Sequence, residues 1–193
     1  AAWAFPDPFL ADWEGRTRAG KPMPLLGDGS RGPATIITSV LHPETAILWM
    51  YDYPGLMRRF SDLLAHKMVA LNHLLRAFSG NTQAGWWITD DNCALFNPAL
   101  YAEYCYPVLQ QVLAALAPGQ ARRYQHSDSN MGHLLDQQVA LGIHEVNYGP
   151  TVDAALIRRK MPTALIHGCL PPFLLRNGSP EAIRARIVSD FEK

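Results

Sequence analysis

The chain has 193 residues, enough for one domain but few for two, since domains usually contain roughly 100 to 200 residues. Its 17 basic residues balance 17 acidic ones without a long block of either sign, which argues against nucleic acid and against an electrostatic membrane anchor. Three separated cysteines without a CxxC pair predict no disulfide framework, and they favour a reducing, cytoplasmic location. The N-terminal residues lack a signal-peptide pattern and no long apolar run follows, so we expect no membrane partner. We expect a small-molecule substrate.

The first 31 residues contain four prolines, and proline fixes φ and lacks the N–H that regular structure uses. We therefore expect an irregular, proline-rich arm over residues 1–31 and a single domain over residues 32–193. The glycine-rich GDGSRG has neither the spacing of a dinucleotide-binding loop nor the lysine of a P-loop, so it predicts a turn. The β-branched residues of ATIITSVL (34–41) then predict a buried strand.

Two long helices and a strand are predicted next. Apolar residues recur at intervals of three and four from Tyr53 to Phe78, which predicts an amphipathic helix that ends at Gly80. The short apolar run GWWIT (85–89) predicts a strand. Asn97-Pro98 is a typical start for a second long helix, and Pro118-Gly119 a typical end.

The rest of the chain alternates between short strands and helices. The spacing of the strands is close to the minimum for a crossover between parallel strands, so the fold class is α/β. About five strands are expected, whereas a closed barrel needs eight strands and roughly 250 residues. We therefore predict an incomplete (β/α) TIM-type barrel of about five βα units, with an open, doubly wound sheet as the alternative. Because unpaired strand edges invite association, we expect a dimer, another homo-oligomer, or a partner chain that covers the barrel. The predicted strands are RRYQHS, GIHEVNYG and TALIHG, and the predicted helices are MGHLLDQQVAL, VDAALIRRK and PEAIRARIVSDFEK.

Polar and ionisable residues follow each predicted strand. In parallel α/β folds these positions meet at one edge of the sheet, so they predict a functional site. Capping of helix N-termini is the simpler explanation for Asp91 and Asn130 taken singly, but capping requires neither imidazole nor thiol. The residues are Thr38 and Ser39; Asp90, Asp91 and Asn92; His126, Ser127 and Asp128; Asn147 and Tyr148; and His167, Gly168 and Cys169.

Two histidines lie one residue away from another possible metal ligand. His126 and Asp128 can point to the same side of an extended strand end, which suits a metal or an imidazole acting as acid or base. His167 and Cys169 repeat this gap, so the four residues together predict a possible zinc site. The other histidines and the Trp86-Trp87 pair are explained by surface exposure or by packing.

Five segments resemble the uroporphyrinogen decarboxylase superfamily, which includes cobalamin-dependent methyltransferases that carry zinc. The resemblance runs in the same order from Gly32 to Glu192. It implies a (β/α) barrel that lacks about three strands before residue 1 and a last unit after Lys193. The segments are GPATIITSV, MYDYPGLMRRF, ITDDNCALFNPALYAEYCYPVL, YQHSDSNMGHLLDQQVALGIHEVNYGP and IHGCLPPFLLRNGSPEAI.

The decarboxylases of this superfamily imply a lyase of porphyrin biosynthesis that acts on a porphyrinogen or a related small molecule without a cofactor. Ser39 stands where the family has a substrate-binding tyrosine, and Asp91 stands where it has a serine. Two aspartates at the strand ends suit a polyanionic substrate poorly, because like charges repel. On this interpretation the catalytic residues are His126, Asp128 and Asp90, and the substrate-binding residues are Ser39, Asp91, Asn92, Asn147, Tyr148 and His167.

The methyltransferases of the superfamily imply a different chemistry, in which zinc assists transfer to or from a corrinoid protein or a thiol. Their zinc ligands include a His-x-Cys at the strand that matches YQHSD. Here His126 is retained and Asp128 replaces the cysteine, so an oxygen ligand stands in place of a softer sulfur. On this alternative the metal ligands are His126, Asp128, His167 and Cys169. A non-catalytic interaction subunit is a third alternative, favoured by the incomplete barrel.

Overall fold

The computed structural model describes residues 7–21, 25–168 and 170–193. Its five strands form one parallel sheet in the order β1-β2-β3-β4-β5, so each strand pairs with the next one along the chain. This sequential order is that of a barrel wall, whereas a doubly wound sheet reverses direction after its first strands. The fold is therefore α/β and a partial TIM-type barrel, as predicted. The strands are β1 (Gly29–Arg31), β2 (Gly85–Thr89), β3 (Arg122–Ser127), β4 (Glu145–Tyr148) and β5 (Leu165–Ile166).

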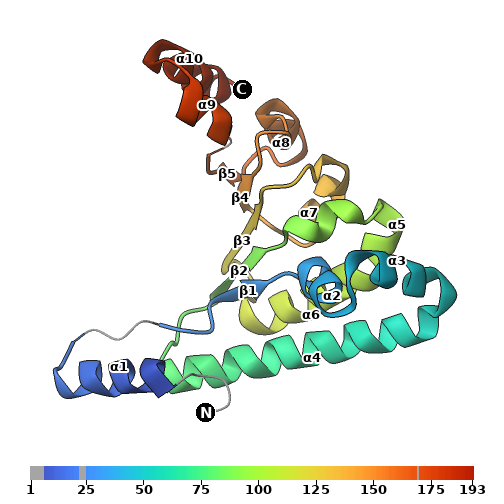
Figure 1. The fold of residues 1–193 in the computed structure, drawn as a ribbon, viewed down its shortest axis with the longest axis vertical. Coiled ribbons are helices and arrows are strands. Elements are labelled where there is room, and N and C mark those ends of the chain that lie inside the picture. Colours follow the sequence, from blue (N-terminus) through green and yellow to red (C-terminus); the bar gives the residue numbers. More distant parts are fainter. Residues whose placement is uncertain (1–6, 22–24, 169) are drawn as a thin grey trace.

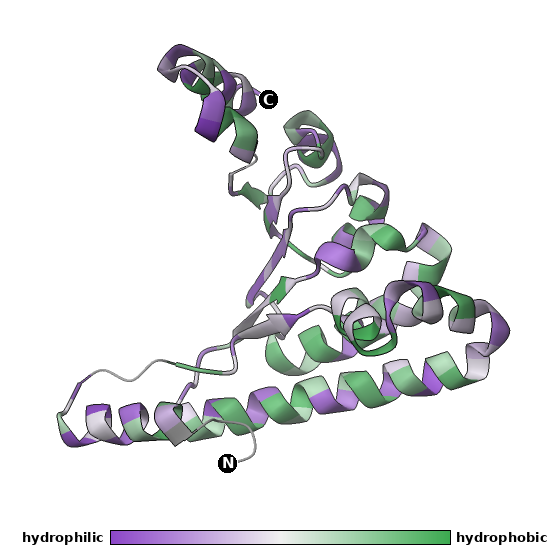
Figure 2. Ribbon diagram, viewed as in Figure 1, coloured by the Kyte–Doolittle hydropathy of each residue, from purple (hydrophilic) through white to green (hydrophobic). Residues whose placement is uncertain are grey.

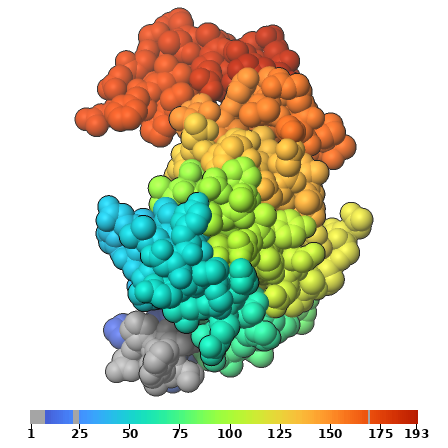
Figure 3. Space-filling view, turned by 90° about the vertical axis from the view of Figure 1, so that its right-hand side faces the viewer, coloured from blue at the N-terminus to red at the C-terminus, as the bar shows by residue number. Residues whose placement is uncertain are grey.

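Helices α2 to α8 gather to the right of the sheet and below it in Figure 1, and α9 and α10 lie apart at the top. In a view turned by 90°, the yellow and orange residues of the later part of the chain lie above the blue and green residues of the earlier part, and the red C-terminal residues lie at the top (Figure 3). Among the described residues, no helix is both long and apolar enough to cross a membrane. The helices are α1 (Asp7–Arg18), α2 (Pro33–Leu41), α3 (Pro43–Asp52), α4 (Pro54–Ser79), α5 (Pro98–Leu100), α6 (Tyr106–Leu116), α7 (Leu135–Ala140), α8 (Ala154–Lys160), α9 (Pro172–Asn177) and α10 (Pro180–Phe191), with short helical segments η1 (Asp91–Leu95), η2 (Tyr101–Cys105) and η3 (Gly132–Leu134).

The two long predicted helices are confirmed. Helix α4 ends at Gly80, whose φ of 69° is the left-handed conformation that glycine adopts without strain. The second helix begins where the Asn97 side chain accepts a hydrogen bond from the N–H of Leu100, and it continues through η2 into α6. The largely apolar α6 lies between the sheet and α4, whose polar and apolar residues alternate along its length (Figure 2).

The segment ATIITSVL forms helix α2, so the prediction of a strand there is wrong. Pro33 occupies the first turn, where its fixed φ suits a helix and no N–H is needed. The carboxylate of Asp90 accepts a hydrogen bond from the N–H of Thr35 at 2.7 Å. This cap comes from a residue 55 positions away, and it stabilises a helix whose β-branched residues favour a strand locally. Ser39 consequently lies exposed on α2 instead of at a strand end.

The N-terminal region also differs from the irregular arm that was expected. Residues 7–18 form α1, and the ring of Trp13 packs against Phe78 of α4 with their centroids 4.7 Å apart. Residues 29–31 form β1, which pairs with β2. The sheet therefore begins before residue 32, although residues 1–6 and 22–24 lie outside the described part of the chain.

The two faces of the sheet differ in burial. Residues Trp86, Ile88, Gln125, Val146 and Tyr148 point toward the helices and are buried. Alternate residues point to the opposite side, because successive side chains of a strand face opposite ways. Most of these remain partly exposed, so we call this side the open face. Its residues are Gly29, Arg31, Trp87, Thr89, Arg122, Tyr124, His126, Glu145, Asn147 and Leu165.

Candidate functional site

Three possible metal ligands meet at the ends of β2 and β3. One ligand atom each of Asp91, His126 and Asp128 lies within 4.8 Å of the other two. Asp91 is the first residue of η1, His126 is on the open face of β3, and Asp128 follows that strand. Both aspartates are exposed and His126 is half-buried, so the cluster is accessible to a ligand from solution. The prediction that polar residues converge at this edge of the sheet applies to these three.

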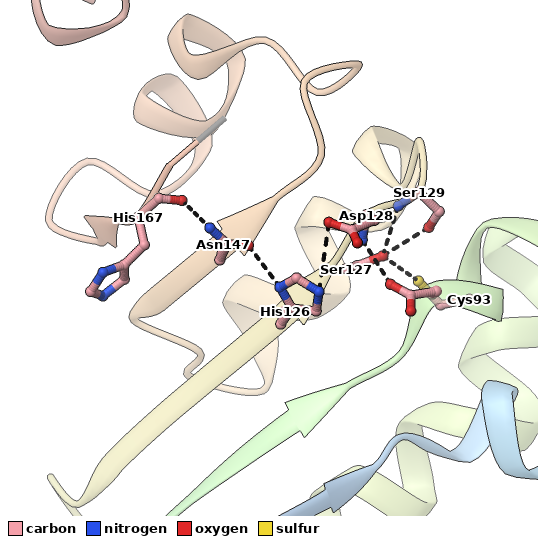
Figure 4. Close-up of polar contacts among 8 residues, drawn as sticks. Cys93, His126, Ser127, Asp128, Ser129, Asn147 and His167 are labelled. Atoms are coloured by element: carbon pink, nitrogen blue, oxygen red, sulfur yellow. Dashed lines mark hydrogen bonds and ion pairs between the residues drawn. The ribbon is translucent and has the colours of Figure 1, made fainter. Parts of the chain in front are cut away.

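The imidazole of His126 is held between two side chains (Figure 4). Its Nδ1 is 2.7 Å from Oδ1 of Asn147, and its Nε2 is 3.6 Å from Oδ1 of Asp128. The Asn147 amide nitrogen donates to the carbonyl oxygen of His167, so the amide oxygen faces His126 and accepts a hydrogen bond. Nδ1 therefore carries the proton in the neutral ring. The lone pair of Nε2 is left free for a metal ion or a proton.

Asp91 and Asp128 are joined by a backbone contact. The N–H of Asp128 donates to Oδ1 of Asp91 at 2.7 Å, which links the loops after β2 and β3. A Cβ on Gly149 would overlap the backbone of Asp128, so glycine allows the loop after β4 to pack against this link. Neighbouring strand ends thus fix the positions of both carboxylates.

These residues fit a divalent cation. One imidazole nitrogen and two carboxylate oxygens make three protein ligands, the number that catalytic zinc sites use with a fourth position left open. Imidazole suits zinc, and carboxylates suit zinc as well as the harder manganese and magnesium ions. The two negative charges balance a divalent ion, and the exposure of the cluster leaves room for a substrate.

Asp90 was expected in the same site but lies on the other side of the sheet. It follows Trp86 and Ile88 on the helix-covered face, where its carboxylate is fully buried at the start of α2. Burial raises the pKa of Asp90 to about 6, although the hydrogen bonds from Thr35 and Ala34 oppose that shift. Its Oδ2 accepts no hydrogen bond from the described residues. Asp90 stabilises α2 and does not reach the open face.

Two further predicted residues also lie away from the cluster. Asn92 donates to the hydroxyls of Thr35 and Thr38, which fastens η1 to α2. Tyr148 is buried on the helix-covered face, and burial raises the pKa of its hydroxyl well above the ordinary value. Both residues support the fold, and neither faces a ligand at the strand ends.

His167 contributes its backbone to the site but not its ring. The ring points away from His126 in Figure 4, and its Nε2 is 2.7 Å from Oε1 of Glu145. Arg122 holds the same carboxylate through two hydrogen bonds, and these contacts lower the pKa of Glu145. His167 is therefore not a partner of His126 in a metal site. Cys169, the other predicted ligand, lies outside the described residues.

Comparison with protein families gives a match. The family model described as uroporphyrinogen decarboxylase (URO-D) matches residues 12–190, almost the whole chain. The chain belongs to the uroporphyrinogen decarboxylase family. A search of curated proteins gave no significant match. Membership in the URO-D family agrees with the partial barrel and with the resemblance seen in the sequence, and it suggests an enzyme.

The sequence analysis did not identify two residues on the open face of this URO-D family member. Arg31 ends β1, a strand of three residues that begins with glycine and carries no strand pattern. Glu145 begins β4, and its contacts to Arg122 and His167 depend on strand register. The sequence offered one indication of its position: Glu145 is two residues from Asn147, and residues two apart in a strand point to the same side of the sheet.

We predict that Asn147 sets the tautomer of His126. Replacement of Asn147 by leucine removes the acceptor for Nδ1, and loss of such a partner typically lowers metal affinity about 10- to 100-fold. Asn147→Asp keeps an acceptor oxygen and should restore most of the affinity. Nitrogen chemical shifts of the His126 ring would report the tautomer directly. Unchanged shifts and unchanged zinc affinity in Asn147→Leu would contradict this role.

Proposed function

We propose that this URO-D family member is a zinc-dependent enzyme that transfers a methyl group from a corrinoid to a thiol. The observation that supports the proposal is the cluster of Asp91, His126 and Asp128, whose ligand atoms lie within 4.8 Å of one another. The cluster lies at the carboxyl ends of parallel strands, where barrel enzymes place their active sites. Other members of the same superfamily perform this transfer with zinc.

Each residue of the cluster has a separate role in this reaction. Bound zinc would supply a Lewis acid that lowers the pKa of a coordinated thiol, so that the thiolate is present at neutral pH. His126 offers Nε2 as a ligand because Asn147 keeps the proton on Nδ1. Asp91 and Asp128 balance the charge of the ion. With zinc held by these three residues, a coordinated thiol would lose its proton to water, and its sulfur could accept the methyl group while the electron pair of the cobalt–carbon bond would stay with the corrinoid.

The proposal can be tested with small reactants. Metal-free protein, methylcobalamin and 2-mercaptoethanol are mixed with and without zinc, and loss of the cobalt–carbon bond is followed by absorbance. Zinc should accelerate the reaction, and Asp128→Asn should remove most of that acceleration. Asp136→Asn is the matched control, since this exposed aspartate of α7 pairs with Lys160 away from the cluster. A rate that does not depend on zinc would reject the proposal.

Decarboxylation without a metal is the second candidate, and the family match favours it. The His126 ring, whose Nδ1 donates to Asn147, can also carry a proton on Nε2. Oδ1 of Asp128, 3.6 Å from Nε2, would stabilise the charged ring. His126 would then donate this proton to a pyrrole ring carbon. Asp90 does not take part, because it is buried on the other face. Conversion of uroporphyrinogen by the protein in the presence of a chelator, lost in His126→Ala, would favour this reaction over methyl transfer.

A further inference from the structure

The open face carries an aromatic surface next to the metal cluster. A Cβ on Gly29 would overlap the five-membered ring of Trp87, so the indole lies across β1 in the space that this glycine leaves. Gly29 and Trp87 are register partners on the same face of the sheet. Trp87 is half-buried, so part of the ring remains accessible. This arrangement provides a flat apolar surface for a ligand.

Arg31 lies two residues further along β1, at the end of the strand. Register pairs Arg31 with Thr89 and Thr89 with His126, so all three are at the same height on the open face. Adjacent strands are about 4.8 Å apart, which places the Cα atoms of Arg31 and His126 about 10 Å apart. Arg31 is exposed, and no hydrogen bond or ion pair from the described residues occupies its guanidinium.

The other arginine of the open face is already engaged. Arg122 donates two hydrogen bonds to Glu145 and lies over the ring of Tyr124, 5.0 Å from its centroid. Arg31 is thus the available cation at the strand ends of the described open face. With a divalent ion balanced by Asp91 and Asp128, its single positive charge remains uncompensated and complements one negative charge on a ligand.

We infer that Arg31 and Trp87 form a binding subsite for a flat, apolar ligand that carries one anionic group. The carboxylate or similar group contacts the guanidinium, and the apolar body rests on the indole. The inference deepens the proposed function and rests on it for one point, that the reacting end of the substrate is directed toward His126. Arg31 then determines specificity by selecting anionic over neutral substrates.

Benzoate and benzamide form a suitable pair of probes, because they have nearly the same shape and differ in charge. Their dissociation constants are measured by calorimetry on the zinc-loaded protein and on the metal-free protein. Benzoate should bind roughly tenfold more tightly than benzamide, as expected for a charge-assisted hydrogen bond at a partly exposed site. Arg31→Gln should abolish this preference, and Trp87→Leu should lower the affinity for both ligands to a similar extent.

Arg59→Gln is the matched control, since this exposed arginine lies on α4 and should leave the preference intact. A preference that persists in Arg31→Gln would show that benzoate binds elsewhere, for example to zinc, and would overturn the inference. Equal binding of the two probes would also overturn it. If zinc does not bind, the proposed function fails, whereas a benzoate preference of the metal-free protein that depends on Arg31 would still support the subsite.

Discussion

Replacing His126 by alanine is expected to abolish stoichiometric zinc binding. The ring supplies the nitrogen ligand of the cluster, and the two remaining carboxylates are exposed and solvated. Loss of a residue that merely supports a ligand typically lowers metal affinity about 10- to 100-fold, so loss of the ligand itself should exceed about 100-fold. Metal content after dialysis against buffered zinc, measured by mass spectrometry, would give the stoichiometry of each variant.

His73→Ala is the matched control for this experiment. His73 is an exposed histidine of α4, outside the cluster, and its loss should leave the zinc content unchanged. Circular dichroism of both variants would check that the fold is retained. Equal zinc content in His126→Ala and in the unsubstituted protein would show that the metal binds elsewhere, and it would remove the basis for methyl transfer.

Asp90 should make stability fall as the pH rises from about 4 to about 7. Burial raises its pKa from 3.8 to about 6, so the folded protein holds this proton more tightly than the unfolded chain. The contribution is fully present below pH 4 and is lost as the pH passes through 6. Its size is about 3 kcal/mol, the free energy that corresponds to this change in pKa. Asp90→Asn cannot ionise and should lack this dependence.

The measurement is urea unfolding of both proteins across this pH range. Other groups titrate too, among them Glu145, whose lowered pKa gives the opposite trend. The difference between Asp90→Asn and the unsubstituted protein cancels these shared contributions, and it should favour the variant by about 2 kcal/mol more at pH 7 than at pH 4. Asp62→Asn, at an exposed position of α4, should give a constant difference. If the stability curves of Asp90→Asn and of the unsubstituted protein run parallel, the Asp90 carboxylate is already charged in the folded protein near pH 4.

The fold followed from the sequence where local patterns and tertiary contacts agree. The apolar spacing of α4 and the short runs of β2 to β5 predicted these elements because each pattern matches the period of its structure. The prediction of a strand at ATIITSVL was wrong because the β-branched residues of this segment favour a strand, whereas Pro33 and the distant Asp90 carboxylate stabilise a helix. The three residues of β1 carry no pattern, since their pairing with β2 defines the strand.

Part of the candidate site could be predicted, because residues that follow neighbouring parallel strands lie close together. His126, Asp128 and Asp91 do converge, because they follow neighbouring parallel strands. Asp90 was misplaced because adjacent residues of an extended chain point in opposite directions. The alternation of Trp86 and Ile88 carries this information in the sequence. The direction of the His167 ring could not be predicted, since it depends on the contact with Glu145 across two strands.

The hydrogen bond from Asp128 to Asp91 bears on the choice of ion. It uses one lone pair of Oδ1 of Asp91 and fixes the orientation of this carboxylate, which disfavours its rotation into a bidentate contact with an ion. Calcium prefers six to eight oxygen ligands and often a bidentate carboxylate, which the three groups of the cluster supply poorly. Zinc accepts four ligands, one from each group. We therefore expect the link between the two loops to discriminate against calcium, so that the site remains selective in calcium-rich surroundings.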